Sequence, residues 1–145
     1  MRKAAKYLTT LVLFVSAAAI VHAHCQIPCG IYDDQMRIHM MEEHVTTIEK
    51  SMKKIEANES QNQTVRWVNN KENHANELTE IVTYYFLTQR IKPGMDKYEE
   101  NLKVLHEIMI YSMKAKQTTD LKNVEKLNEL IHKFEHTYMG DKHEH

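Results

Sequence analysis

The chain has 145 residues, a formal net charge of −1 and only three glycines and two prolines. A near-neutral charge gives no basic excess for binding nucleic acid, and a chain of this length makes one domain around a single core. Good helix formers dominate after residue 34, which excludes a strand-rich fold.

The first 23 residues have the layout of a secretory signal peptide. Three basic residues precede an apolar run over residues 11–21, which is about half the ~20 residues needed to span a bilayer. Val21 and Ala23 stand at the two positions that a signal peptidase reads, so we expect cleavage after Ala23. The mature protein would be exported, periplasmic or extracellular, with a net charge of −4 and no membrane segment, because the leader carries three basic residues.

The first residues after this boundary hold the only two cysteines of the chain. The sequence reads His24-Cys25-Gln26-Ile27-Pro28-Cys29-Gly30-Ile31-Tyr32. In an oxidising compartment, two cysteines this close are read first as a disulfide in a structural helical module. That alternative does not need a histidine directly before the first cysteine.

Cleavage after Ala23 would give His24 a free α-amine with a pKa of about 7.7 to 8, beside its imidazole. The amine, the amide nitrogen of Cys25 and its thiolate can close two adjacent five-membered chelate rings, which favours a planar set of donors. Cys29 can return through the turn at Pro28 as the fourth donor. Planar nitrogen and sulfur donors suit nickel or copper better than zinc. We favour nickel, because anionic donors stabilise its higher oxidation state, with the His24 imidazole as a fifth, axial ligand.

Four amphipathic helices are expected after the cysteines. The first can be capped by Asp33 or Asp34, and residues 58–63 are expected to form a loop before the second helix. The second ends at Pro93-Gly94, and the turn before the fourth lies around residues 117–120. Their apolar stripes contain, in chain order, Ile38, Met41, Val45, Ile48, Met52 and Ile55; Val68, Ala75, Leu78, Val82 and Tyr85; Tyr98, Leu102, Leu105, Ile108, Met109 and Ser112; and Val124, Leu127, Ile131, Phe134 and Tyr138.

Four helices of similar length with short connections pack most simply as an up-down-up-down bundle. The expected class is therefore all-α, a four-helix bundle with an irregular N-terminal metal hook. The expected divisions are a signal peptide at 1–23, the hook at 24–32, the bundle at 33–139 and a polar tail at 140–145.

The stretch from His24 to Tyr32 resembles the nickel hook of the nickel-dependent superoxide dismutases, His-Cys-any-any-Pro-Cys-Gly-any-Tyr at the mature N-terminus. The resemblance implies conversion of superoxide to oxygen and hydrogen peroxide, with one nickel ion per subunit alternating between Ni(III) and Ni(II). It also implies that His24 binds the metal through its amine and imidazole, Cys25 through its amide nitrogen and thiolate, and Cys29 through its thiolate.

The resemblance assigns roles to residues around the metal as well. Tyr32 corresponds to the tyrosine beside the open face of the metal, and Tyr85 to a second tyrosine that hydrogen-bonds the first; plain packing is the alternative for each. The family's glutamate and arginine that steady the axial histidine are replaced here by His39 and His74, although both could also be solvent-facing helical residues.

The resemblance further implies a homohexamer in which the hooks lie near subunit contacts. Apolar residues outside the main stripes, such as Trp67, Val104 and Ile110, are compatible with such interfaces. The main alternative from another class is an exported, non-catalytic metal-binding or metal-storage bundle that uses the Met and His residues.

Overall fold

The computed structural model describes residue 26 and residues 28–140. The expected signal peptide, the two expected ligands His24 and Cys25, and the tail after Gly140 lie outside the described residues. Within the described part, the chain forms long helices and no strand. The all-α class is confirmed.

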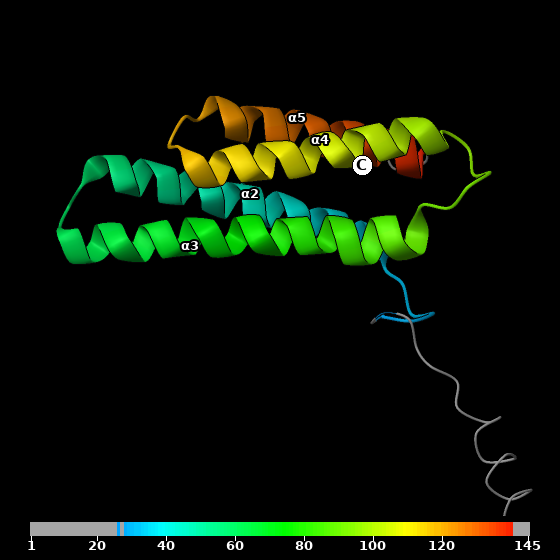
Figure 1. Cartoon of the computed structure of the whole chain (residues 1–145), viewed down its shortest axis with the longest axis horizontal. Coiled ribbons are helices and arrows are strands. Elements are labelled where there is room, and N and C mark those ends of the chain that lie inside the picture. The colour runs from blue at the N-terminus through cyan, green and yellow to red at the C-terminus, as the bar shows by residue number, and fades with distance from the viewer. Residues whose placement is uncertain (1–25, 27, 141–145) are drawn as a thin grey trace, which may run out of the picture.

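The helices form an up-down-up-down bundle (Figure 1). They are α2 (Asp34–Ala57), α3 (Gln61–Glu80), which continues without a break as the π-helix η1 (Ile81–Arg90), α4 (Tyr98–Gln117) and α5 (Lys122–Met139). Each helix packs on its neighbours in the sequence, and α5 closes the bundle by packing on α2. This is the expected topology.

The core consists mainly of the predicted stripes. Leu78, Leu105 and Phe134 are fully buried in it. Two predictions were wrong. Val68 is 37% exposed: residues 61–70 of α3 include no buried residue, and the α2–α3 hairpin extends past the turn between α4 and α5 (Figure 1). Val104 is 1% exposed, so it belongs to the core and not to a free surface.

The loop between α2 and α3 is shorter than the polar stretch 58–63 predicted. Asn58 ends α2 in the left-handed conformation (φ 46°), which asparagine tolerates. Ser60 already caps α3 by accepting a hydrogen bond from the backbone N–H of Gln63. The polar residues after Ser60 therefore form the exposed first turn of a helix.

Lys71, on α3, caps the C-terminal end of α4. Its side chain is buried, and its ammonium donates to the carbonyl oxygens of Ala115, Lys116 and Thr118 at 2.9, 2.6 and 3.1 Å. The last carbonyls of a helix have no partner within the helix. A buried cation here satisfies them and complements the helix dipole.

The π-helix η1 was not predicted. Its wider turns bond residues five apart, as the backbone bond from Ile91 N–H to Phe86 O at 2.8 Å shows. Side chains four and five apart therefore stay on one face: Tyr85 and Arg90 bond Asp34 at the start of α2, and Gln89 accepts a hydrogen bond from Tyr32 just before it. The chain then leaves the helix and turns at Gly94, whose φ of +88° suits glycine.

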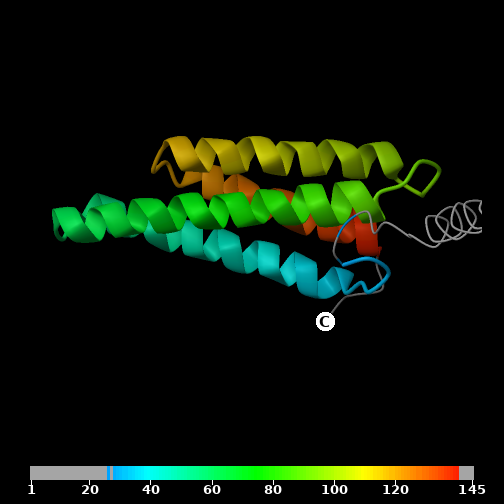
Figure 2. The same ribbon diagram turned by 60° about the horizontal axis from the view of Figure 1, so that its bottom comes forward.

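The antiparallel arrangement gathers four segments at one end of the bundle. The start of α2, the end of η1, the start of α4 and the end of α5 all lie there, and so do the described residues that precede α2 (Figures 1 and 2). Among the described residues, no helix combines the length and the apolar character that crossing a membrane requires.

Candidate metal centre and the cavity beside it

The described part of the hook is an exposed turn directly before α2. Gly30 has a φ of +79°, which a residue with a side chain adopts only with strain. Cys29 is exposed, and its thiol is free within the described residues. An exposed thiol on a tight turn fits a site for a thiophilic metal whose remaining donors come from elsewhere in the hook.

Tyr32 leaves the hook and lies against η1. The guanidinium carbon of Arg90 is 4.4 Å from the centre of its ring, and the ring of Tyr85 meets it edge-on at 5.9 Å. Its hydroxyl donates a long hydrogen bond of 3.4 Å to Gln89 Oε1. Tyr32 is 39% exposed, so these contacts hold in place a residue that is still partly open to solvent.

The predicted hydrogen bond between Tyr85 and Tyr32 was wrong. The two rings are in contact, but the hydroxyl of Tyr85 donates to Asp34 Oδ1 at 2.6 Å. Tyr85 is only 3% exposed, so it is a core residue, and its ring supports Tyr32 through the edge-on contact. Asp34 attracts its hydroxyl because a carboxylate is the stronger acceptor.

Asp34 joins the start of α2 to two other helices. Arg90 donates to it from Nε (2.8 Å to Oδ1) and from Nη2 (2.7 Å to Oδ2), and Tyr138 donates to Oδ2 at 2.8 Å. Asp33 takes the capping role instead, accepting from the N–H of Met36. Sequence reasoning missed this use of Asp34. The only available signal was that an antiparallel bundle places residues 34, 90 and 138 at the same end.

These contacts fix the charges of the group. Burial alone would raise the pKa of Asp34, but the hydrogen bonds from Arg90, Tyr85 and Tyr138 outweigh it and hold that pKa below its ordinary value. Burial and the hydrogen bond to Asp34 raise the pKa of Tyr138 to about 12. Asp34 and Arg90 thus stay ionised at neutral pH, and both tyrosines stay protonated.

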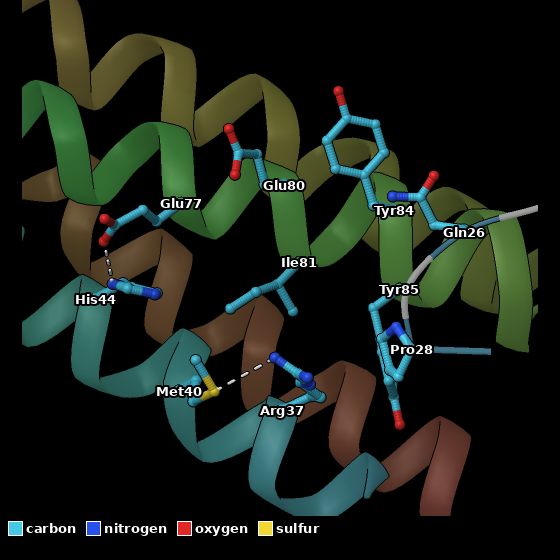
Figure 3. Close-up of a pocket in the computed structure, with 10 residues that line it drawn as sticks. All are labelled: Gln26, Pro28, Arg37, Met40, His44, Glu77, Glu80, Ile81, Tyr84 and Tyr85. Carbon is cyan, nitrogen blue, oxygen red and sulfur yellow. Dashed lines mark hydrogen bonds and ion pairs between the residues drawn. The ribbon is translucent and has the colours of Figure 1, made fainter. Parts of the chain in front are cut away.

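A cavity of about 430 Å³ lies beside the hook, between α2 and the rod formed by α3 and η1 (Figure 3). Its lining residues are Gln26, Pro28, Arg37, Met40, His44, Glu77, Glu80, Ile81, Tyr84 and Tyr85. Arg37 contributes the only cationic side chain of this wall other than histidine. Its guanidinium contacts Met40 Sδ and lies 5.1 Å from the centre of the Tyr85 ring, and no carboxylate of the described residues pairs with it.

The two histidines predicted to support the metal ligands lie on different helices and have different partners. His39 is exposed on α2 and hydrogen-bonds Gln35 on the same helix at 3.0 Å. His74, on α3, faces His44 instead, and their Nδ1 atoms are 2.8 Å apart. Because His24 lies outside the described residues, support of the axial ligand by His39 and His74 stays a prediction. The sequence had given no sign of His44.

The comparison with protein-family models gave one finding. The model described as nickel-containing superoxide dismutase matches residues 19–142, which covers the hook and the whole bundle. No curated protein and no solved structure matches the chain.

Proposed function

Because the chain belongs to the nickel-containing superoxide dismutases, it is an enzyme that acts on superoxide, and we propose that its reaction takes place at the hook, residues 24–32. In the overall reaction, two superoxide anions and two protons give one oxygen molecule and one hydrogen peroxide molecule. One anion is oxidised and the other is reduced. When bound, the nickel ion supplies a one-electron couple between Ni(III) and Ni(II), which lets the two half-reactions proceed separately.

The hook would hold one nickel ion per chain. His24 would contribute its amine and imidazole, Cys25 its amide nitrogen and thiolate, and Cys29 its thiolate. The structural observation that carries this proposal is the exposed thiol of Cys29, three residues before a tyrosine fixed on the bundle. The non-catalytic storage alternative gives no reason for that placement.

The protein groups beside the hook suit a small anion that must also receive protons. Arg37 offers a small anion a guanidinium that no carboxylate of the described residues pairs, although Glu77 and Glu80 on the same cavity wall carry the opposite charge. The hydroxyl of Tyr32, a residue that is 39% exposed, would order water beside the hook and pass on a proton from it. The contacts of Tyr32 with Arg90 and Gln89 hold its ring against η1.

The decisive experiment measures three properties of the mature protein from a host that exports it and supplies nickel. These are the N-terminal mass, the nickel content and the rate of superoxide decay. A chain that begins at His24, holds about one nickel and accelerates the decay is the expected result. A chain that retains Ala23, or one that is metal-free with a Cys25–Cys29 disulfide, would contradict the proposal and favour the storage or structural alternative.

A matched pair of variants tests the ligand role. Cys29→Ser replaces a thiolate by a poor nickel ligand and is expected to lose both nickel and activity. His106→Gln alters an exposed histidine on α4, which contributes nothing to the cavity wall, and should keep both. Nickel and activity retained in Cys29→Ser would contradict the proposed ligand set.

We also propose that the protein is exported, with cleavage after Ala23, and that nickel binds only after cleavage. The reason is that the amine of His24 exists as a ligand only when the leader is gone. A precursor purified with its leader should therefore contain no nickel in the hook. Full nickel loading of that precursor would contradict the proposal.

Finally, we propose a homohexamer in which neighbouring subunits cover the hooks. A short hook cannot make a core of its own, and contacts with other subunits would supply rigidity and limit solvent access. Ile31 and Met36, which flank Tyr32 in the sequence, are 81% and 44% exposed and offer apolar surface for such contacts.

A further inference from the structure

Three potential metal-binding side chains converge at the interface of α2 and α3, outside the hook. They are His44 on α2 and His74 and Glu77 on α3, and their ligand atoms all lie within 4.8 Å of one another. His44 Nδ1 is 2.8 Å from His74 Nδ1. Glu77 Oε2 is 3.4 Å from the first of these atoms and 3.5 Å from the second. We propose that these three residues form a second metal site, for a divalent cation such as Zn²⁺, Ni²⁺ or Co²⁺.

The separations match the geometry of a small divalent cation. With bonds of about 2.0 to 2.1 Å, two ligands of a tetrahedral ion lie about 3.3 to 3.4 Å apart. The two distances to Glu77, 3.4 and 3.5 Å, are already close to this value, and only the two imidazoles must separate by about half an ångström. At 2.8 Å one Nδ1 donates its hydrogen to the other, so a cation would replace this shared proton.

The chemistry of the three side chains also suits a divalent cation. Two imidazoles and one carboxylate form a common set of zinc ligands, in which the fourth position is left to water. Burial lowers the pKa of His44, which keeps its imidazole neutral, the form that binds metal. Glu77 supplies the negative charge and lies, with His44, on the wall of the cavity beside the hook (Figure 3). A cation can therefore reach the site from solvent.

The two helices hold the ligands in place without a metal. His74 and Glu77 are three residues apart on α3, so both face α2, and His44 comes from the facing side of α2. Only 12% of the His44 side chain and 26% of the His74 side chain are exposed. A second group, Glu42, His132 and Glu135, has a single imidazole that is 69% exposed and more distant carboxylates, so it is the weaker candidate.

The test uses the mature chain carrying Cys25→Ser and Cys29→Ser, so that binding does not depend on the thiolates of the hook. Co²⁺ is the probe, because four-coordinate Co²⁺ has visible absorption bands and thiolate ligation adds a separate near-ultraviolet band. We expect one Co²⁺ per chain, visible bands without the thiolate band, and displacement by one equivalent of Zn²⁺. Absence of stoichiometric binding would overturn the proposal, whatever the nickel content of the wild-type hook.

Variants in the same background locate the cation. His44→Ala and the less buried His74→Gln should each weaken Co²⁺ binding by at least about 100-fold, because loss of even an outer partner of a ligand costs up to about that factor. His132→Gln removes the imidazole of the second group and should leave binding unchanged. Circular dichroism confirms folding of each variant. Binding that survives in folded His74→Gln, or that is lost in His132→Gln, would show that His44, His74 and Glu77 form an ordinary hydrogen-bonded cluster.

Discussion

At the scale of single residues, the hook end is organised by one carboxylate. Asp34 accepts hydrogen bonds from Arg90, Tyr85 and Tyr138. Arg90 and Tyr85, which it holds, are also two of the three residues that contact Tyr32 from η1. Support for the tyrosine beside the hook therefore depends on an ion pair whose partners are 56 positions apart in the chain.

The first prediction concerns this carboxylate. Asp34→Asn should lower the free energy of unfolding by about 2 to 4 kcal/mol at pH 7, because it leaves the mostly buried charge of Arg90 unpaired. The pKa of Asp34 is lowered by folding, so its contribution is present at neutral pH and is lost as the pH falls below about 4. Urea unfolding at pH 7 and pH 3 should show the difference between variant and wild type shrinking in acid.

The neighbouring residue offers a control. Asp33→Asn should be nearly neutral at both pH values, because asparagine caps a helix about as well as aspartate does. Equal losses in the two variants would mean that the helix cap, and not the ion pair, accounts for the effect.

The second prediction separates the hydroxyl of Tyr85 from its ring. Tyr85→Phe keeps the edge-on contact with Tyr32 but removes the hydrogen bond to the charged Asp34. The expected loss of stability is about 1.5 to 3 kcal/mol, measured by thermal or urea unfolding. The adjacent Tyr84→Phe, at a side chain that is 51% exposed, should change stability by less than about 0.5 kcal/mol. An unchanged Tyr85→Phe would remove the argument for Asp34 as the organising group.

At the scale of secondary-structure elements, the π-helix η1 decides which side chains reach the hook. Its residues follow α3 in one continuous rod, but the wider turns hold Gln89 and Arg90 on the face of Tyr85. A helix with ordinary turns would keep Gln89 near the face of Tyr85 but rotate Arg90 away from Asp34 and Tyr32. Such segments often lie at functional sites, and here the segment supplies Tyr85, Gln89 and Arg90, which all contact Tyr32.

The third prediction tests this placement. Deleting Thr88 should return the segment to ordinary α-helix, in which Arg90 follows Tyr85 at four positions and keeps its contact with Asp34. Helix content by circular dichroism should stay near the wild-type value, and stability should change by no more than about 1 kcal/mol. Thr88→Ala, which keeps the chain length, should also cost no more than about 1 kcal/mol. A loss of about 2 to 4 kcal/mol in the deletion variant, as in Asp34→Asn, would show that the wide turns themselves are needed to hold Arg90 at Asp34.

The fourth prediction concerns the end of α4. Lys71→Met keeps most of the side-chain volume but leaves the carbonyls of Ala115, Lys116 and Thr118 without their buried donor. We expect a loss of about 1 to 3 kcal/mol in urea unfolding. Lys116→Met removes an exposed hydrogen bond to Asn76 and a surface ion pair with Glu72, and should cost less than about 1 kcal/mol. Equal effects would contradict the capping role of Lys71.

At the scale of the whole molecule, the up-down-up-down topology brings distant sequence together at one end. The described part of the hook, the Asp34 group and the cavity all lie there, while the short turns at residues 58–60 and 118–121 lie at the other end. Ile31 and Met36, two of the exposed apolar side chains, lie at the same end of the bundle.

The fifth prediction addresses assembly. If neighbouring subunits cover the hook, Met36→Glu should place a charge in that contact and convert the hexamer to smaller species, as measured by light scattering after gel filtration. Val65→Glu changes a similarly exposed apolar residue near the opposite end and should leave the mass unchanged. A monomeric wild type, or an intact hexamer in Met36→Glu, would contradict the proposed arrangement.

The sequence by itself determined the helices, their order and the family. Apolar residues such as Ile38, Leu105 and Phe134 repeat with the helical period, which is a local property of the chain, and the motif from His24 to Tyr32 lies within nine consecutive residues. The tertiary structure decided which side chains meet. Asp34 bonds Arg90, and His44 pairs with His74, across long separations in the chain, while the wide turns before Arg90 depend on packing. Helical periodicity and a short motif describe only neighbouring residues, so neither carries that information.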